Sequence, residues 1–92
     1  IRSRSNRIIG YTARYIGNDS HDIPKYINST SSILYSKETT IFGIDTAIRA
    51  AVKDDKFYLV EGAPDVLRLQ SIGTNNTVAA LGGFWSENQL RQ

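Results

Sequence analysis

The stretch FYLVEGAPDVLRL, residues 57–69, decides the fold of this 92-residue chain. Its first four residues are apolar or aromatic, and such a short continuous run predicts a strand buried on both faces of a parallel sheet. An acid and a glycine, Glu61 and Gly62, follow directly. Pro64 and Asp65 then suit a first helical turn, because proline fixes a helical φ and a carboxylate meets the positive end of the helix dipole. The stretch predicts a strand, an acidic turn and a helix.

The segments around this stretch extend the same alternation. In IFGIDTAIRAAVKDD, residues 41–55, apolar side chains recur at helical spacing and predict a helix. TVAAL, residues 77–81, reads as a second buried strand and is followed by Gly82 and Gly83. SENQ, residues 86–89, has the capping-box pattern that starts a helix. Strand–helix–strand connections of this length predict parallel neighbouring strands.

The N-terminal third has a different character. RIIGYTARYIG, residues 7–17, is rich in β-formers and predicts a strand or a tight hairpin. We expect a loop at residues 18–22 and an irregular, polar segment in IPKYINSTSS, residues 23–32. The fold class is therefore α/β, with an N-terminal β-hairpin region followed by β-α-β-α with parallel strands.

Composition narrows the class of protein. Apolar residues make up 40% of the chain, enough for a globule rather than a disordered segment. The absence of cysteine excludes disulfides and thiolate metal sites and fits a reducing cytoplasm. No apolar run approaches the roughly 20 residues of a membrane span, so we expect no membrane partner. The chain also lacks methionine, even at position 1, which suggests a piece of a longer polypeptide.

Charge is unevenly distributed along the chain. The formal net charge is +2, but residues 1–25 hold five basic and two acidic side chains, a net +3. The remainder holds six basic and seven acidic side chains, a net −1. A basic front end beside a nearly neutral body suggests contact with phosphates, the alternative being a solvated basic tail.

Glu61 is the candidate for chemistry. Ligands of open parallel sheets bind at the carboxyl ends of the strands, where Glu61 and Gly82 should meet. A carboxylate there can hold a divalent cation or accept a proton, and Gly62 lets a substrate approach closely. Asp65, one helical turn on, could brace the Glu61 loop. The alternative is an ordinary loop acid followed by an ordinary helix-start acid.

Several blocks together resemble a known family. VEGAPDVLRL, followed by VAALG and a capped helix, resembles the first half of a Toprim domain. RIIGYTARYIG and PKYINS, followed by LYSK and IFGIDTA, resemble the catalytic (RNA polymerase) core of bacterial DnaG-type DNA primases. The similarity runs in order from Arg7 to Leu90. It implies a basic N-terminal part of the primase core in residues 1–40 and the first half of a Toprim domain in residues 41–92.

The resemblance also implies roles for individual residues. Glu61 matches the Toprim glutamate that acts with metal in phosphoryl transfer, and Asp65 matches the final acid of that motif. Ser29 completes the K-Y-x-N-S block. The positions that match nucleotide- or template-binding residues are Arg14, Lys25, Tyr26, Asn28, Lys37, Gly62 and Gly82.

The implied activity is synthesis of RNA primers on a single-stranded DNA template from ribonucleoside triphosphates. The resemblance implies magnesium or manganese as cofactor, a replicative helicase as partner, and zinc only in an upstream module. The sequence departs from the family where Thr12-Ala13 replace a glycine pair and Ala63-Pro64 follow the E-G. Glu38 and Thr39 stand where a glycine and a basic residue are common. A weaker basic groove and a divergent primase of a phage or mobile element would fit these departures.

The family's metal site also needs a D-x-D motif on the strand after Gln92. Two-metal chemistry needs several carboxylates to hold ions about 4 Å apart. We therefore expect the isolated 92 residues to be inactive, with the remaining metal ligands elsewhere. Two alternatives stay open: another Toprim enzyme, such as a nuclease or topoisomerase, and a non-catalytic nucleic-acid-binding module of Toprim shape.

Overall fold

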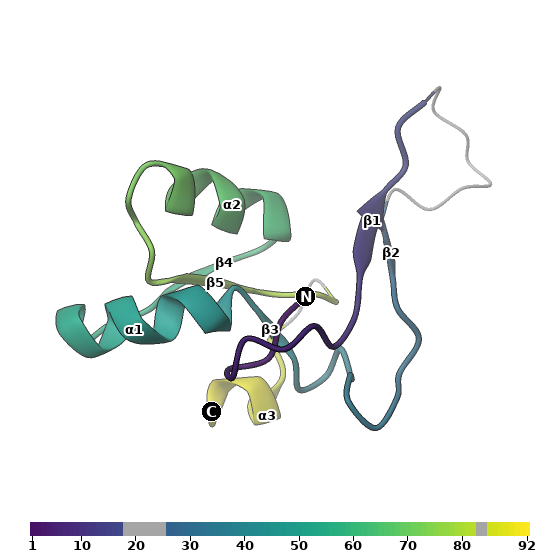
Figure 1. The fold of residues 1–92 in the computed structure, drawn as a ribbon, viewed down its shortest axis with the longest axis horizontal. Helices are drawn as coiled ribbons and strands as arrows, with labels where there is room; N and C mark the ends of the chain where they lie inside the picture. Colours follow the sequence, from purple (N-terminus) through teal and green to yellow (C-terminus); the bar gives the residue numbers. More distant parts are fainter. Residues whose placement is uncertain (18–25, 83–84) are drawn as a thin grey trace.

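The computed structural model describes residues 1–17, 26–82 and 85–92, and within them it contains two small sheets and three helices (Figure 1). One sheet is an antiparallel pair, β1 (Thr12–Arg14) and β2 (Tyr26–Asn28). The other has the strand order β3-β5-β4, from β3 (Ile41–Phe42), β5 (Thr77–Ala80) and β4 (Tyr58–Val60). The helices are α1 (Ile44–Asp54), α2 (Ala63–Ser71) and α3 (Glu87–Leu90). The α/β class with an N-terminal hairpin is confirmed.

The parallel pair of the prediction is present. β4 runs parallel to β5, with Tyr58 opposite Thr77 and Val60 opposite Ala79. All four residues of β5 are buried, as predicted for a central strand. Figure 1 shows α1 and α2 on opposite sides of this sheet. The α2 connection between β4 and β5 is the strand–helix–strand unit that the sequence indicates.

A glycine between β3 and α1 allows the elements to pack closely. Gly43 has a φ of 88°, in the left-handed region that favours glycine. A Cβ atom there would lie 2.8 Å from Cγ1 of Val66 and 3.1 Å from the Thr77 carbonyl oxygen. The start of α1 therefore lies against both α2 and β5. On the α1 side, a core of Ile41, Ile44, Ala47 and Val78 is buried, with Ile48 and Trp85 packed against it.

The helix predicted over residues 41–55 begins later than expected. Ile41 and Phe42 form β3, which pairs antiparallel with Ala80 and Ala79. The helical spacing was misleading because both isoleucines, Ile41 and Ile44, face the same core. This antiparallel strand was missed by the sequence reasoning.

The prediction of an irregular segment at residues 23–32 is wrong for residues 26–28. These residues form β2, which pairs with β1 so that Thr12 lies opposite Asn28 and Arg14 opposite Tyr26. Tyr26 and Ile27 are β-formers that pair with β1, and the prediction gave too much weight to the polar residues around them. The strand predicted in residues 7–17 is confirmed at residues 12–14, but its partner lies in the later segment. The loop predicted at residues 18–22 lies outside the described residues.

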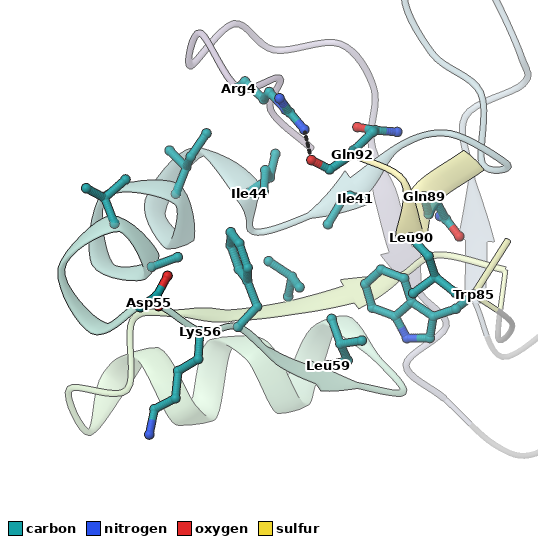
Figure 2. Close-up of a pocket in the computed structure, with 15 residues that line it drawn as sticks. Arg4, Ile41, Ile44, Asp55, Lys56, Leu59, Trp85, Gln89, Leu90 and Gln92 are labelled. Atoms are coloured by element: carbon teal, nitrogen blue, oxygen red, sulfur yellow. Dashed lines mark hydrogen bonds between the residues drawn. The ribbon is translucent and has the colours of Figure 1, made fainter. Parts of the chain in front are cut away.

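The prediction that residues 57–60 are buried on both faces is also wrong. Tyr58 and Leu59 are 43% and 52% exposed. β4 is an edge strand of the described sheet, and Leu59 lines an open groove of about 540 Å³ between α1 and α3. Figure 2 shows Ile44, Trp85 and Leu90 around this groove. The apolar run thus predicts the strand correctly but does not predict how far it is buried.

The final helix has the predicted cap. The Ser86 hydroxyl accepts a hydrogen bond from the Gln89 backbone N–H, and the Gln89 side chain accepts one from the Ser86 N–H at 2.8 Å. Gln89 is only 2% exposed, so the cap is also part of the interior. None of the helices in the described ranges is long and apolar enough to cross a membrane.

Candidate functional site

A groove of about 440 Å³ lies where the hairpin meets the carboxyl ends of β4 and β5. We call it the Glu61 groove. It brings together residues that are distant in sequence, from the hairpin, from the β4–α2 turn and from the end of β5. Its lining residues are Thr12, Tyr26, Asn28, Glu61, Gly62, Ala63, Pro64, Asp65, Ala80 and Leu81.

The acidic side of the groove follows from the β4–α2 turn. Glu61 comes directly after β4 and is exposed, and Gly62 is the extended N-cap of α2. Asp65 lies in the first turn of α2, and its backbone N–H donates to the Gly62 carbonyl at 3.2 Å. A Cβ atom on Gly62 would lie 4.0 Å from Oδ2 of Asp65, so this carboxylate lies beside the turn. Two carboxylates therefore face one opening.

The hairpin is tied to this edge of the sheet by Asn28. The Nδ2 amide of Asn28 donates a hydrogen bond to the Leu81 carbonyl oxygen at 3.1 Å, across 53 positions of sequence. Leu81 is the residue after β5. The bond joins β2 to the end of the central strand. Asn28 thus holds the hairpin side of the groove.

The basic and aromatic residues of the hairpin form a pair. The Arg14 guanidinium lies 5.8 Å from the centroid of the Tyr26 ring, within the range of a cation–π interaction. Both residues face each other across the β1–β2 register. Tyr26 is 42% exposed, so its ring is open to a ligand as well. The pair places a cation and an aromatic face beside the carboxylates.

Lys37 reaches the same edge of the sheet from another loop. A Cβ atom on Gly82 would lie 3.9 Å from Cδ of Lys37, so the lysine stem passes beside the chain that leaves β5. Gln89 of α3 fixes the backbone of this loop. The Nε2 amide of Gln89 donates hydrogen bonds to the carbonyl oxygens of Lys37 at 3.1 Å and Thr40 at 2.8 Å. The sequence indicated Gln89 only as a capping residue, and its role in fixing the Lys37 loop was missed.

Glu38 modifies the charge beside Lys37. The Ser36 hydroxyl donates a hydrogen bond to its carboxylate at 2.6 Å. This hydrogen bond lowers the pKa of Glu38, with smaller contributions that include the charge of Lys37. Glu38 therefore stays ionised at neutral pH. Its negative charge partly offsets that of Lys37, the neighbouring residue in the sequence.

The groove offers two carboxylates, Glu61 and Asp65, as candidate ligands for a metal ion. Within residues 1–17, 26–82 and 85–92, no three or more His, Cys, Asp or Glu side chains are grouped to hold a metal ion. Magnesium is often bound through one or two carboxylates together with substrate phosphates and water. Glu61 and Asp65 fit an ion that arrives with a triphosphate, rather than one held by these residues alone.

Most of the predicted site residues are brought together. Tyr26, Asn28, Glu61, Gly62 and Asp65 line one groove. Arg14 joins it through Tyr26, and Lys37 lies beside Gly82 at the same edge. Ser29 has a different position: its hydroxyl accepts from the Tyr11 N–H at 2.8 Å and holds the hairpin together. Lys25 lies outside the described residues.

Comparison with known proteins identifies the class to which this unit belongs. The family model of the DNA primase catalytic core, N-terminal domain, matches residues 1–48, more than half of the chain. The DNA primase of Synechocystis sp. is 42% identical over 91 residues, which cover 99% of this chain and 14% of that protein. The chain therefore spans only about a seventh of this curated relative.

Solved structures agree with the family match. The zinc-binding and RNA polymerase domains of Aquifex aeolicus primase match with a TM-score of 0.90 and 39% identity, over 97% of this chain and 22% of that one. The RNA polymerase domain of Mycobacterium tuberculosis primase DnaG, solved with a double-stranded DNA oligomer with a 6-nucleotide overhang, also matches at 0.90. Its identity is 32%, over 99% of this chain and 28% of that one. The chain belongs to the bacterial DnaG-type DNA primase family.

Proposed function

We propose that the protein synthesises RNA primers on single-stranded DNA by metal-dependent transfer of ribonucleotides. The observation that carries this proposal is the Glu61 groove, in which two carboxylates and the hairpin residues Tyr26 and Asn28 converge in a member of the primase family. Residues 41–92 act in this proposal as the first half of a Toprim domain, and residues 1–40 as the basic N-terminal part of the core.

The proposed reaction joins a 3′-hydroxyl to the α-phosphate of an incoming triphosphate. A bond forms between the 3′-oxygen and the α-phosphorus, the bond to the bridging oxygen of the β-phosphate breaks, and pyrophosphate leaves. Glu61 holds the cation or accepts the proton of the hydroxyl, and Asp65 fixes the turn beside it. A bound magnesium or manganese ion would neutralise phosphate charge and lower the pKa of the attacking hydroxyl.

The hairpin supplies template and nucleotide contacts. The Arg14 guanidinium lies 5.8 Å from the centroid of the Tyr26 ring, and its planar fork suits a phosphate bound in bidentate fashion. The other face of the Tyr26 ring can stack on a base. Lys37 adds a cation beside Gly82, and Lys25 has the same proposed role. These contacts position the strand without reading its sequence.

The wider setting is part of the same proposal. The Aquifex relative combines zinc-binding and RNA polymerase domains, which supports an upstream zinc module in this protein too. A replicative helicase is the expected partner, because primers are needed where duplex DNA is opened, and the cytoplasm is the expected place of action. The isolated 92 residues should be inactive, since their described part offers no larger group of acidic ligands.

The test is incorporation of labelled ribonucleotides on single-stranded DNA by the full-length protein, with magnesium or manganese. Glu61→Gln keeps the shape of the side chain and removes its charge. We expect a loss of at least about 100-fold in primer yield, the usual scale for losing an acid–base group. Glu87→Gln is the matched control, because Glu87 is exposed on α3 and pairs with Arg91 away from the groove.

The outcomes separate the alternatives. Short RNA products that disappear in Glu61→Gln and persist in Glu87→Gln support the proposal. No products from a well-folded wild type on several templates, with DNA binding retained, would instead favour a non-catalytic nucleic-acid-binding module. Metal-dependent cleavage of the template without synthesis would favour a nuclease.

A further inference from the structure

The basic N-terminal segment is ordered as a tight turn rather than a tail. Arg2 forms an antiparallel bridge with Ile8, and the Ser3 N–H donates to the Arg7 carbonyl at 2.9 Å. Asn6, with a φ of 67°, turns the chain, and its carbonyl accepts from the Arg2 guanidinium at 2.9 Å. These bonds fix residues 2–8 as a hairpin-like turn that carries three arginines.

This turn lies against α1 and forms a shallow pocket with it. The pocket has a volume of about 300 Å³ and is lined by Arg4, Ser5, Asn6, Asp45, Thr46 and Arg49. We call it the arginine pocket. The Arg4 guanidinium also donates to the Gln92 carbonyl oxygen at 3.1 Å, as Figure 2 shows. The arginine pocket and the Glu61 groove have no lining residue in common.

The charge of this region favours an anion. The charged residues that line the pocket are Arg4, Arg49 and Asp45, a net +1, and Arg2 and Arg7 of the same turn bring the region to +3. Among the described residues, the only ion pair within 4.0 Å is that of Arg91 with Glu87, so none of these four arginines is neutralised at that distance. Two guanidinium groups from elements 45 positions apart thus line one pocket together with hydroxyl donors from Ser5 and Thr46.

From this arrangement we infer that the arginine pocket is a second nucleic-acid contact, which binds backbone phosphates of a strand that extends beyond the Glu61 groove. Guanidinium groups suit phosphate because their planar forks donate two parallel hydrogen bonds. The pocket is open and polar, as a sequence-independent backbone contact requires. The inference rests on the proposed function only for the choice of nucleic acid as the polyanion.

The salt dependence of DNA binding tests this inference. Fluorescence anisotropy of the full-length protein would be measured with labelled single strands of about 4 and about 16 nucleotides, the span of common site sizes. Each phosphate contact on a single strand contributes about 0.7 to the slope of log K against log salt. The double variant Arg4→Gln/Arg49→Gln should therefore lower the slope by about 1.4 for the long strand. At 0.1 M salt this corresponds to about 25-fold weaker binding.

Three controls make the result specific. Arg4→Lys/Arg49→Lys should keep the wild-type slope, because it keeps both charges. Lys53→Gln/Arg68→Gln removes two exposed cations that lie outside the pocket, and should change neither slope nor affinity. Arg49→Gln alone, which leaves the Arg4–Gln92 hydrogen bond intact, should lower the slope by about 0.7. The affinity for the short strand, which binds in the Glu61 groove, should not change in any of these variants.

An unchanged slope in a folded Arg4→Gln/Arg49→Gln variant would overturn the inference. So would an equal loss of affinity for the short and long strands, which would place both strands at one site. Binding of an acidic peptide that is lost in the variant, with DNA binding unchanged, would likewise overturn it and assign the pocket to a protein partner. A priming assay on the wild type tests the proposed function separately, because the slope difference does not depend on catalysis.

Discussion

Replacing Asn28 by alanine should separate the two parts of the Glu61 groove. The variant loses the hydrogen bond from Nδ2 to the Leu81 carbonyl oxygen at 3.1 Å. The bond itself contributes about 1 kcal/mol, and the half-buried carbonyl left without its partner raises the cost to about 1–3 kcal/mol. That range is the expected loss in the free energy of unfolding.

The effect on activity should exceed the effect on stability. Asn28 joins β2 to the residue after β5, so without it the Arg14–Tyr26 pair is no longer fixed relative to Glu61. A displacement of about 1 Å in a positioning group can cost about 100-fold in rate. We therefore expect primer synthesis by the full-length protein to fall about 100-fold while the fold persists at 25 °C.

The matched control for this prediction is Ser29→Ala. The Ser29 hydroxyl accepts from the Tyr11 N–H at 2.8 Å, a hydrogen bond of the same kind that stays within the hairpin region and does not reach the sheet. Urea denaturation and the priming assay would be run on both variants. Equal losses of priming in the two variants, or full priming in Asn28→Ala, would refute the view that this amide positions the hairpin for chemistry.

Three further predictions concern the interior. Tyr35 is 2% exposed, and its hydroxyl has no hydrogen-bond partner among the described residues, so Tyr35→Phe should raise the free energy of unfolding by about 1 kcal/mol, measured by urea denaturation. Burial, followed by the charge of Glu38, raises the pKa of Tyr35. Tyr35 therefore ionises in the unfolded state at a lower pH than in the folded state, and the free energy of unfolding of the wild type should fall as the pH rises above about 10. The same fall in the Tyr35→Phe variant would contradict this. Gln89→Ala should lower the free energy of unfolding by about 2–4 kcal/mol, because the buried Thr40 carbonyl and the part-buried Lys37 carbonyl lose their donor. It should also weaken DNA binding through Lys37. Asn88→Ala, at an exposed position of the same helix, should do neither, and equal effects of the two variants would refute the assignment.

Local sequence signals predicted the elements that depend on local chemistry. Pro64 and Asp65 mark the start of α2, Ser86 and Gln89 form the cap of α3, and the apolar run at residues 77–81 gives the central strand. Each of these signals acts within one helical turn or one strand, so a single sequence is enough to detect it.

The elements that were missed depend on partners distant in sequence. β2 is a strand because Tyr26 and Asn28 pair with Arg14 and Thr12. Two β-formers, Tyr26 and Ile27, between polar neighbours do not reveal this pairing. β3 is a strand because Ile41 pairs with Ala80. The exposure of Leu59 depends on which elements cover the sheet, and an apolar run cannot report that. Strand pairing, and the covering of a sheet by other elements, depend on the whole fold rather than on a short window of sequence.

The difference between local signals and contacts distant in sequence also explains how the two sides of the candidate site were predicted. Glu61 and Asp65 were found because the end of a parallel strand is a general location for ligands. The hairpin side of the groove came from the family resemblance, since nothing local connects Asn28 to Leu81 across 53 positions. A weak general rule and a specific resemblance thus selected residues that meet in one groove of the fold. The resemblance also includes Glu61 and Asp65, so the two lines of reasoning overlap at the carboxylates. What neither line could supply is the geometry, in which Tyr26 and Asn28 of the hairpin line the same groove as both carboxylates.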